Sequence, residues 1–175
     1  MQEKYFKILS TAIILKEPYK EGITPRYLIT QRAEHEETFP GMWHVPGGHF
    51  TTEDFLPFPK DVGDYWYNIL EESLKREIKE ETNLDIKNIW YLTSLTWDTD
   101  KEYASIVLSF VADWAGDEIK LDEDTQDYKW VTFEEAKNYK LFDGILEELW
   151  MTERALKGEK DVQFEPVPKT VKSSK

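Results

Sequence analysis

Three glutamates near the middle of the chain have a spacing that suits a metal site. Glu77, Glu80 and Glu81 lie three and four residues apart, so on a helix their carboxylates project from one face. Carboxylates held this close repel one another unless a cation lies among them. Mg²⁺ accepts a few carboxylate oxygens, keeps several waters and binds substrate phosphates. Together with the preceding turn Pro46-Gly47-Gly48, the pattern predicts a site for cleaving a diphosphate.

The same helix also has features of an ordinary solvated surface. Glu71 and Lys75 form a charge pair at i, i+4 spacing, as an exposed helix face commonly does. In contrast, no basic residue lies three or four positions after Glu80 or Glu81. The helix alone therefore leaves both interpretations open, a metal site and a solvated face.

Motifs along most of the chain resemble those of the Nudix hydrolases. The family's box is Gly, five residues, Glu, seven residues, then Arg-Glu-aliphatic-x-Glu-Glu-x-Gly-aliphatic. The run Arg76-Glu77-Ile78-Lys79-Glu80-Glu81-Thr82-Asn83-Leu84 matches its second half at every position but one. Trp43-His44-Val45-Pro46-Gly47-Gly48 looks like the lead-in to the catalytic loop. Residues 28–32 resemble the preceding strand and residues 129–136 a late strand-to-helix junction.

The resemblance implies a Nudix fold, an α/β/α sandwich with a mixed sheet, and a pyrophosphohydrolase activity. It implies that Glu77, Glu80 and Glu81, with the Gly47 carbonyl, hold Mg²⁺, with Mn²⁺ as a second candidate. Arg76 joins these glutamates in the catalytic set, in a structural role. The general base is open between Glu77, Glu81 and a distant carboxylate. For the distant base we select Glu123, Asp124 and Asp127, and also consider Asp98 and Asp100.

The chain departs from the box in two places. From Gly48 to Arg76 is 28 positions (76 − 48), whereas the pattern has about 14, so about 14 extra residues lie within 51–68. Counting forward, the early Glu that braces Arg76 falls on Asp54, and counting backward it falls on Asn68; Glu53 and Asp64 are further candidates. The late Gly is Asn83, which also tolerates the left-handed conformation at a helix end.

The inserted segment is rich in aromatic residues and proline, from Phe55 to Tyr67. One interpretation is a lid packed on its own aromatic rings. The other is a wall of the substrate pocket or a homodimer contact, because aromatic rings contribute much of the energy at such surfaces.

The candidate substrate contacts come from the strand and turn before the catalytic helix. Arg32 could meet a phosphate with two hydrogen bonds. Trp43 could stack on a base, as could Phe39 and Trp97, although isolated aromatics on strands are more often core. His44, Gly48 and His49 complete the predicted substrate-binding set around the turn.

Composition indicates one enzyme domain. A chain of 175 residues suits a single core, and the absence of cysteine excludes disulfides and thiolate zinc sites. A net charge of −13 argues against a nonspecific nucleic-acid surface. The apolar run 8–15 is too short to span a membrane and lacks a cleavage-like tail, so we expect a cytoplasmic protein. Residues 1–158 form the predicted domain and 159–175 a polar, flexible tail.

Hydrophobic patterning predicts mixed α and β structure. We expect strands at 6–16, 26–31, 43–45, 90–97, 104–114 and 128–131, the pair 90–97 and 104–114 being a hairpin. The catalytic helix is predicted over 67–82 and a last amphipathic helix over 143–156. Thr132 and Glu135 predict a capping box for a short helix ending near residue 139.

Three functions are compatible with these residues. The first is metal-dependent hydrolysis of a nucleoside triphosphate, an ADP-ribose-like compound or a nucleotide sugar. The second is hydrolysis of a non-nucleoside diphosphate. The third is a nucleotide sensor that no longer cleaves, against which the intact glutamate triplet argues. Isomerase chemistry on an isoprenyl diphosphate would need a cysteine, and the chain has none.

Overall fold

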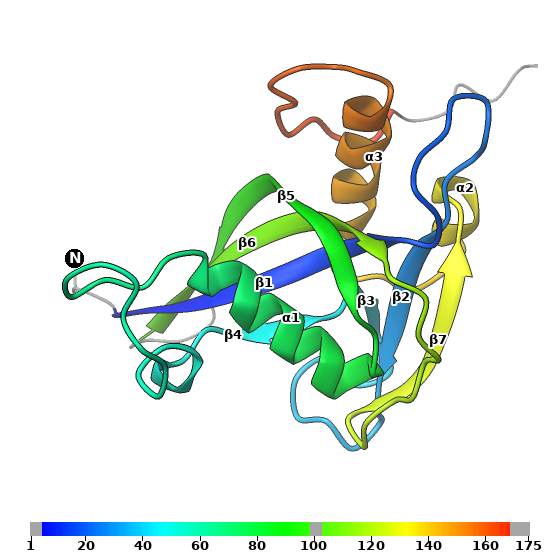
Figure 1. The fold of residues 1–175 in the computed structure, drawn as a ribbon. Coiled ribbons are helices and arrows are strands. Elements are labelled where there is room, and N and C mark those ends of the chain that lie inside the picture. The colour runs from blue at the N-terminus through cyan, green and yellow to red at the C-terminus, as the bar shows by residue number, and fades with distance from the viewer. Residues whose placement is uncertain (1–4, 99–102, 169–175) are drawn as a thin grey trace, which may run out of the picture.

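The computed structural model describes residues 5–98 and 103–168, which form a curled seven-stranded sheet between helices (Figure 1). The main strand order is β3-β2-β1-β6-β5, while β4 pairs with β1 and β7 with β2. The strands are β1 (Tyr5–Leu15), β2 (Tyr27–Arg32), β3 (Trp43–His44), β4 (Gly47–His49), β5 (Ile86–Trp97), β6 (Tyr103–Trp114) and β7 (Thr125–Val131).

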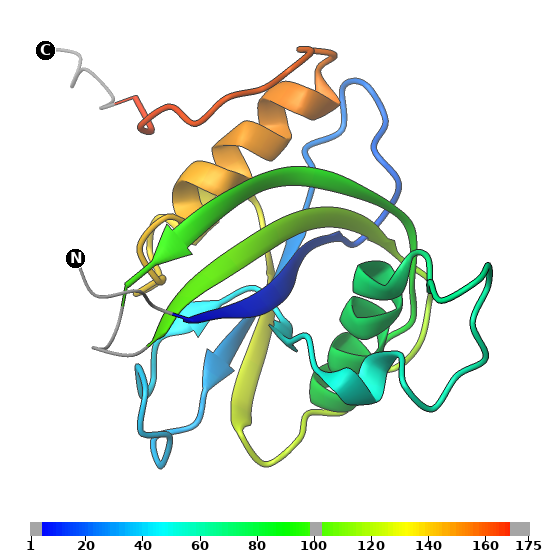
Figure 2. The same cartoon turned by 90° about the vertical axis from the view of Figure 1, so that its left-hand side faces the viewer.

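The centre of the sheet is the parallel pair of β1 and β6, in register from Tyr5 opposite Tyr103 to Leu15 opposite Asp113. The other pairings between the named strands are antiparallel, so the sheet is mixed, as predicted. Both central strands carry long runs of buried β-branched and small apolar residues, which pack against helices on either face. The predicted α/β/α sandwich is thereby confirmed (Figures 1 and 2).

Helix α1 (Ile69–Thr82) covers one face of the sheet. Leu74 and Ile78, one turn apart, are fully buried and pack with Ala12 and Ile14 of β1. The helix ends at Asn83, whose φ of 62° is the left-handed conformation expected where the family has glycine. It begins two residues later than predicted, because Asn68 is also left-handed, with φ of 56°.

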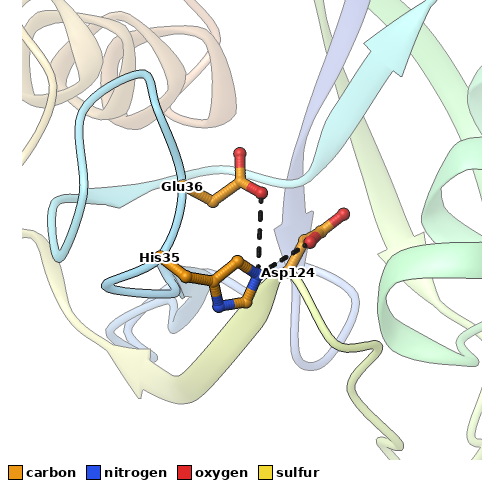
Figure 3. Close-up of side chains that lie close together, drawn as sticks. All are labelled: His35, Glu36 and Asp124. Carbon is orange, nitrogen blue, oxygen red and sulfur yellow. Dashed lines mark hydrogen bonds and ion pairs between the residues drawn. The ribbon is translucent and has the colours of Figure 1, made fainter.

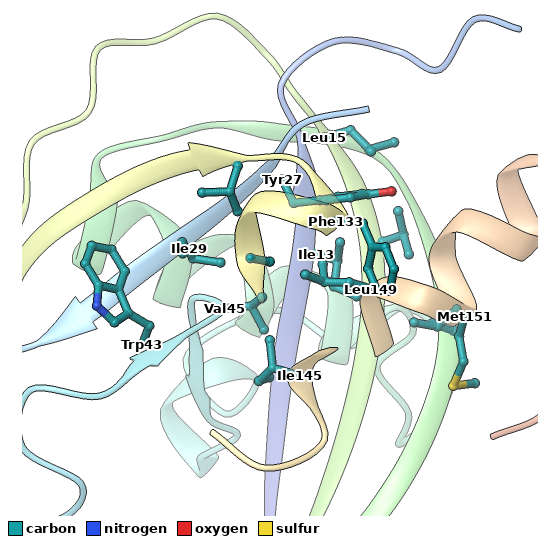
Figure 4. Packing of buried hydrophobic residues seen from close by; sticks show 14 residues of the cluster. Ile13, Leu15, Tyr27, Ile29, Trp43, Val45, Phe133, Ile145, Leu149 and Met151 are labelled. Carbon is teal, nitrogen blue, oxygen red and sulfur yellow. The ribbon is translucent and has the colours of Figure 1, made fainter. Parts of the chain in front are cut away.

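Helix α3 (Ile145–Leu156) covers the opposite face (Figure 2). Leu149 and Met151 are buried against Ile13 and Tyr27 of the first two strands (Figure 4). The shorter helix α2 (Phe133–Ala136) ends three residues before the expected boundary. The predicted capping box starts it: the Glu135 amide donates to Thr132 Oγ1 (3.2 Å), and the Thr132 amide donates to Glu135 Oε2 (2.8 Å).

The predicted hairpin is present as β5 and β6, although its turn residues 99–102 lie outside the described part of the chain. This includes Asp100, one of the carboxylates considered as a base. Strand β5 starts four residues before the expected strand and β7 three residues before it. The added residues of β5 and β7 pair with neighbouring strands, as Ile86 does with Trp114. Alternation of polar and apolar residues does not reveal such pairing partners.

The inserted segment folds onto itself and also exposes apolar side chains. Phe55 stacks on Phe50 and packs edge-on against Trp66, whose indole donates to the Phe58 carbonyl (3.0 Å). A short 3-10 turn, η1 (Thr52–Asp54), precedes it. Five further apolar side chains of the segment are more than half exposed: Leu56, Phe58, Val62, Tyr65 and Tyr67. The segment therefore packs partly on its own rings, as a lid would, and partly exposes its apolar side chains. Its role as a pocket wall or dimer contact stays a prediction.

The described part of the expected tail, 159–168, contacts α3. Arg154 forms salt bridges with Glu159 (3.4 Å) and Glu165 (2.6 Å) and donates to the Gln163 carbonyl (2.6 Å). The division into a domain and a flexible tail stays a prediction. In the described residues, no helix is both long and apolar enough to cross a membrane.

Glu148 is a carboxylic acid inside the α3 face of the fold. It is 5% exposed, and among the described residues its Oε2 atom has no hydrogen-bond partner. Burial raises the pKa of Glu148 to about 7, although a hydrogen bond with Ser109 works against this. The folded state therefore favours the protonated, neutral form of Glu148 over the ionised form.

We expect Glu148→Gln to remove a pH-dependent loss of stability. Because the pKa of Glu148 is higher in the folded than in the unfolded state, its contribution to the stability of the wild-type protein is fully present below the unfolded-state pKa. It is lost as the pH rises through about 7, at a cost of about 3 kcal/mol. Urea unfolding between pH 5 and 8 should show the variant gaining on wild type as the pH rises, whereas exposed Glu17→Gln should not. A difference independent of pH would contradict the assignment.

Candidate active site

The glycine turn is held against strand β1. Strand β4 pairs with β1 so that Gly48 lies opposite Ser10 and Gly47 opposite Thr11. Gly47 has φ of 146°, and a Cβ atom there would lie 2.2 Å from the Ser10 carbonyl oxygen. Glycine is required at this position both by the backbone conformation and by the close approach of β1.

The same turn packs directly on helix α1. A Cβ atom on Gly48 would lie 2.2 Å from Glu77 Oε2, and the Gly47 amide donates to Glu81 Oε2 (3.0 Å). The two halves of the motif, separated by 28 positions in the chain, therefore meet in space. The helix supplies carboxylates, and the turn supplies an amide that orients one of them.

Arg76 connects the elements of the site. Its guanidinium donates to Asp54 Oδ1 (2.7 Å), Glu77 Oε1 (2.7 Å), Glu80 Oε2 (2.8 Å) and the His49 carbonyl (3.3 Å). The hydrogen bond to Asp54 most of all, and then Glu77, raise the pKa of Arg76 above its usual value, although burial works against the rise. The structural role expected for Arg76 thus consists of bridging the turn, the helix and the segment before the insertion.

Asp54 is the acid that braces Arg76. Its side chain is 2% exposed and also accepts from the Thr51 amide (2.7 Å) and from Ser73 Oγ (3.0 Å). Burial opposes ionisation, yet these hydrogen bonds hold the pKa of Asp54 below its usual value. The forward count from Gly48 therefore finds the brace. Glu53 is exposed and Asp64 pairs with Lys60 inside the inserted segment.

The acidic groups around α1 outnumber this arginine. Glu81 is largely enclosed, and its pKa is raised to about 8, mainly by burial and less by the charges of Asp122 and Glu77, while the Gly47 amide and Arg32 work against the rise. The Asp122 amide donates to the Glu81 carbonyl (3.2 Å), and Asp122 Oδ1 is buried with no hydrogen-bond partner in the described chain. A cation among these oxygens would offset both costs.

Asp122 is the site residue that sequence reasoning missed. It directly precedes Glu123 and Asp124, which were selected as distant bases because they come just before a strand. Alternation does not show which acid of such a run turns inward. The structure leaves Glu123 exposed, places Asp124 beside His35 (3.2 Å) and pairs Asp127 with Lys129 (2.7 Å). Their role as bases stays a prediction.

The predicted substrate contacts lie in two places. Gly48 and His49 belong to the turn, where the His49 carbonyl meets Arg76. Trp43 and His44 are both buried in β3; Trp43 belongs to the core beneath α3 and packs edge-on against Tyr139. Burial lowers the pKa of His44 to about 4, so its imidazole is neutral at physiological pH.

Arg32 is the last residue of β2, and its side chain is held by its own loop. It donates to the Thr38 carbonyl (2.8 Å) and forms a salt bridge with Glu36. Its positive charge also lowers the pKa of Glu81, so it lies within electrostatic reach of the carboxylates of α1.

Four aromatic side chains from distant segments form a cluster around Phe142. Phe142 stacks on His44 (5.1 Å between ring centroids) and packs against Phe39 (4.8 Å), which in turn contacts Trp97 (5.2 Å). Phe39 and Trp97 remain 37% and 38% exposed. Gly47 lies three positions after His44, so this aromatic cluster begins within about 10 Å of the turn.

Comparison with known proteins identifies the family. The model of the NUDIX domain matches residues 9–150. The chain belongs to the Nudix family. The nucleoside triphosphatase NudI of Escherichia coli O17:K52:H18 is 30% identical over 126 residues, covering 66% of this chain and 79% of that protein. As a Nudix hydrolase, the protein is an enzyme of the pyrophosphohydrolase type.

Solved structures confirm the Nudix fold. A MutT protein of Methanosarcina mazei Go1 aligns with a TM-score of 0.64 at 22% identity, over 89% of this chain and 98% of that one. The NUDIX domain of Shewanella oneidensis NrtR, complexed with ADP ribose, gives 0.63 at 19% identity, over 89% and 90%. A Caenorhabditis elegans Ap4A hydrolase gives 0.58 at 18% identity, over 87% and 99%.

We expect Asp54→Asn to weaken the enzyme, because it removes the ionised partner of Arg76. Loss of a hydrogen bond between charged groups should cost about 2 kcal/mol of stability and lower kcat at least about tenfold as Arg76 shifts. Glu53→Gln removes the same charge one position away, at an exposed side chain, and should change neither quantity. Equal effects in the two variants, measured by urea unfolding and steady-state kinetics, would contradict the assignment of the brace.

Proposed function

We propose that this Nudix protein is a divalent-metal-dependent hydrolase that cleaves the diphosphate linkage of a nucleotide derivative, with nucleoside triphosphates the first candidates. The observation that carries the proposal is the meeting of the Gly47–Gly48 turn with Glu77 and Glu81 on α1. The relative NudI, named a nucleoside triphosphatase, supports the substrate class.

The residues fit a hard divalent cation. All ligands that the site offers are oxygens, namely the carboxylates of Glu77, Glu80 and Glu81 and the Gly47 carbonyl, which is the donor set of Mg²⁺ and Mn²⁺. Asp122 Oδ1 lacks a hydrogen-bond partner among the described residues, and the raised pKa of Glu81 reflects burial beside other carboxylates; both would be relieved by a cation. A bound Mg²⁺ would neutralise phosphate charge and lower the pKa of a bound water.

The chain's own groups contribute positioning. The Gly47 amide orients Glu81, and Arg76 fixes Glu77 and Glu80 relative to the turn. Asp54 holds Arg76 from behind, so the carboxylates are preorganised. Catalysis of phosphoryl transfer depends mainly on such positioning and electrostatics. Glu77, Glu81, Asp122 and the acids before β7 are the candidates for the general base.

The aromatic cluster favours a nucleotide over a diphosphate that lacks a base. Exposed edges of Phe39 and Trp97 provide π-faces on which a base can stack. They lie on the chain segments that lead into the glycine turn and out of β5. An isoprenoid or other non-nucleoside diphosphate is the second candidate class. A cytoplasmic location remains an expectation from the sequence.

Removal of one carboxylate of α1 tests the reaction. Phosphate and nucleotide release would be measured across nucleoside triphosphates, ADP-ribose, nucleotide sugars, dinucleoside polyphosphates and isoprenyl diphosphates, with Mg²⁺ and after chelation. We expect Glu81→Gln to lower kcat at least about 100-fold and chelation to abolish turnover. Glu72→Gln, an exposed glutamate on the same helix, should stay within about twofold of wild type.

Two results would contradict this proposal. Turnover that survives chelation would exclude the metal-dependent mechanism. Nucleotide binding with no turnover on any substrate would instead support the sensor that the sequence left as an alternative.

Trp97→Ala tests the base-binding part of the proposal. Loss of a stacking surface should raise KM for a nucleoside triphosphate about tenfold while kcat changes little, because the chemistry lies at α1. Tyr91→Ala is the matched control, since Tyr91 is an exposed aromatic of the same strand that packs against Phe110 instead. An unchanged KM in Trp97→Ala, or an equal rise in both variants, would place the base elsewhere.

A further inference from the structure

A second group of metal-ligand side chains lies outside α1. His35 and Glu36 come from the loop after β2, and Asp124 comes from the segment before β7 (Figure 3). His35 Nε2 is 3.2 Å from Asp124 Oδ1 and 4.0 Å from Glu36 Oε1. One ligand atom from each of the three lies within 4.8 Å of the other two, the sole such group among the described residues.

The backbone brings the two segments together. The Ala33 amide donates to the Asp124 carbonyl (2.8 Å), which fixes the start of the loop beside the start of β7. The Glu36 amide then turns back to the Ala33 carbonyl (3.2 Å), so His35 and Glu36 face Asp124. The other carboxylate oxygen of Glu36 is held by Arg32. The group is therefore placed by the fold around β2 and does not depend on free side chains meeting by chance.

The distances suit coordination with little movement. An ion about 2.0–2.2 Å from each of two ligand atoms keeps those atoms within about 4.4 Å of each other. The two pairs that involve His35 meet this limit at 3.2 Å and 4.0 Å, and the third pair, within 4.8 Å, needs at most a small rotation of one side chain. The side chains of His35 and Asp124 are 63% and 57% exposed, which leaves room for water to complete the coordination.

The donor set distinguishes this group from the carboxylates of α1. An imidazole nitrogen with two carboxylate oxygens suits Zn²⁺ or Mn²⁺, whereas Mg²⁺ prefers oxygen ligands. We propose that His35, Glu36 and Asp124 form a second metal site, which binds Zn²⁺ or Mn²⁺ and shares no residue with the site on α1.

An ion at this site would tie the loop 33–42 to the segment before β7. That loop carries Phe39 of the aromatic cluster. Its first residue follows Arg32, whose positive charge lowers the pKa of Glu81. The ion would thus hold in place the loop that presents part of the predicted base-stacking surface. Because an ion that binds the folded state alone adds stability by mass action, it should also raise the melting temperature.

Zn²⁺ titration of the metal-free, full-length protein tests the site. Calorimetry would be done in excess Mg²⁺, which occupies the oxygen ligands of α1, at slightly alkaline pH. We expect one Zn²⁺ per chain and a Kd at least about tenfold weaker in His35→Gln and in Asp124→Asn. Glu37→Gln removes a carboxylate of the same loop that lies outside the group, and should bind as wild type does.

The position of the ion gives a second readout. Crystals grown with Zn²⁺ should show an anomalous difference peak between His35 and Asp124, and the melting temperature of wild type, but not of His35→Gln, should rise with Zn²⁺. The three side chains are at the surface, so melting without metal shows whether each variant is folded. Equal Zn²⁺ affinity in wild type and His35→Gln, or binding lost in Glu81→Gln instead, would overturn the proposal and leave His35 and Asp124 as an ion pair.

Discussion

The contact between the glycine turn and helix α1 is the constraint on which the site depends. A Cβ atom on Gly47 would overlap the backbone of β1, so this position requires glycine, and one on Gly48 would displace the carboxylate of Glu77. This close approach lets the Gly47 amide reach Glu81. Strand pairing on one side and helix packing on the other thus converge at two consecutive glycines.

Helix position follows from the core beneath it. Leu74 and Ile78 are fully buried against β1, so the helix cannot rotate about its axis without exposing apolar surface. Rotation would also carry Glu77 and Glu81 away from the turn. The same packing that stabilises the α1 face therefore determines the direction in which the carboxylates point.

The insertion leaves this arrangement intact because of where it lies. Asp54 precedes the inserted residues and Arg76 follows them, yet the two side chains meet at 2.7 Å. The ends of the inserted segment are therefore already close together, and lengthening such a loop adds little entropic cost. The segment closes on its own aromatic rings, as the contact of Phe55 with Trp66 shows. Its exposed rings add surface beside the site without disturbing the brace.

Negative charges outnumber positive charges around the site. The chain has a net charge of −13, and near the end of α1 one guanidinium faces several carboxylates. Arg76 pairs with Glu77 and Glu80, while Glu81 is buried with a raised pKa and Asp122 Oδ1 is buried without a hydrogen-bond partner among the described residues. Such an imbalance disfavours the ionised carboxylates, and the divalent cation of the proposed function would relieve it.

The sequence by itself determined the elements and the residues that share a face within one element. The i, i+3, i+4 spacing placed Glu77, Glu80 and Glu81 on one side of α1, the capping box located α2, and Asn83 marked the end of the catalytic helix. Residue type and spacing decide these features because a helix repeats every 3.6 residues and its ends need specific partners.

Contacts between distant segments were decided by the tertiary structure alone. Counting along the chain left Asp54, Asn68, Glu53 and Asp64 open as the partner of Arg76, and closure of the inserted segment selected Asp54. Asp122 turned inward because its amide pairs with the end of α1. The aromatic cluster and the meeting of His35 with Asp124 have the same origin. Sequence periodicity records which face a residue occupies within its element, whereas the curl of the sheet decides which faces meet.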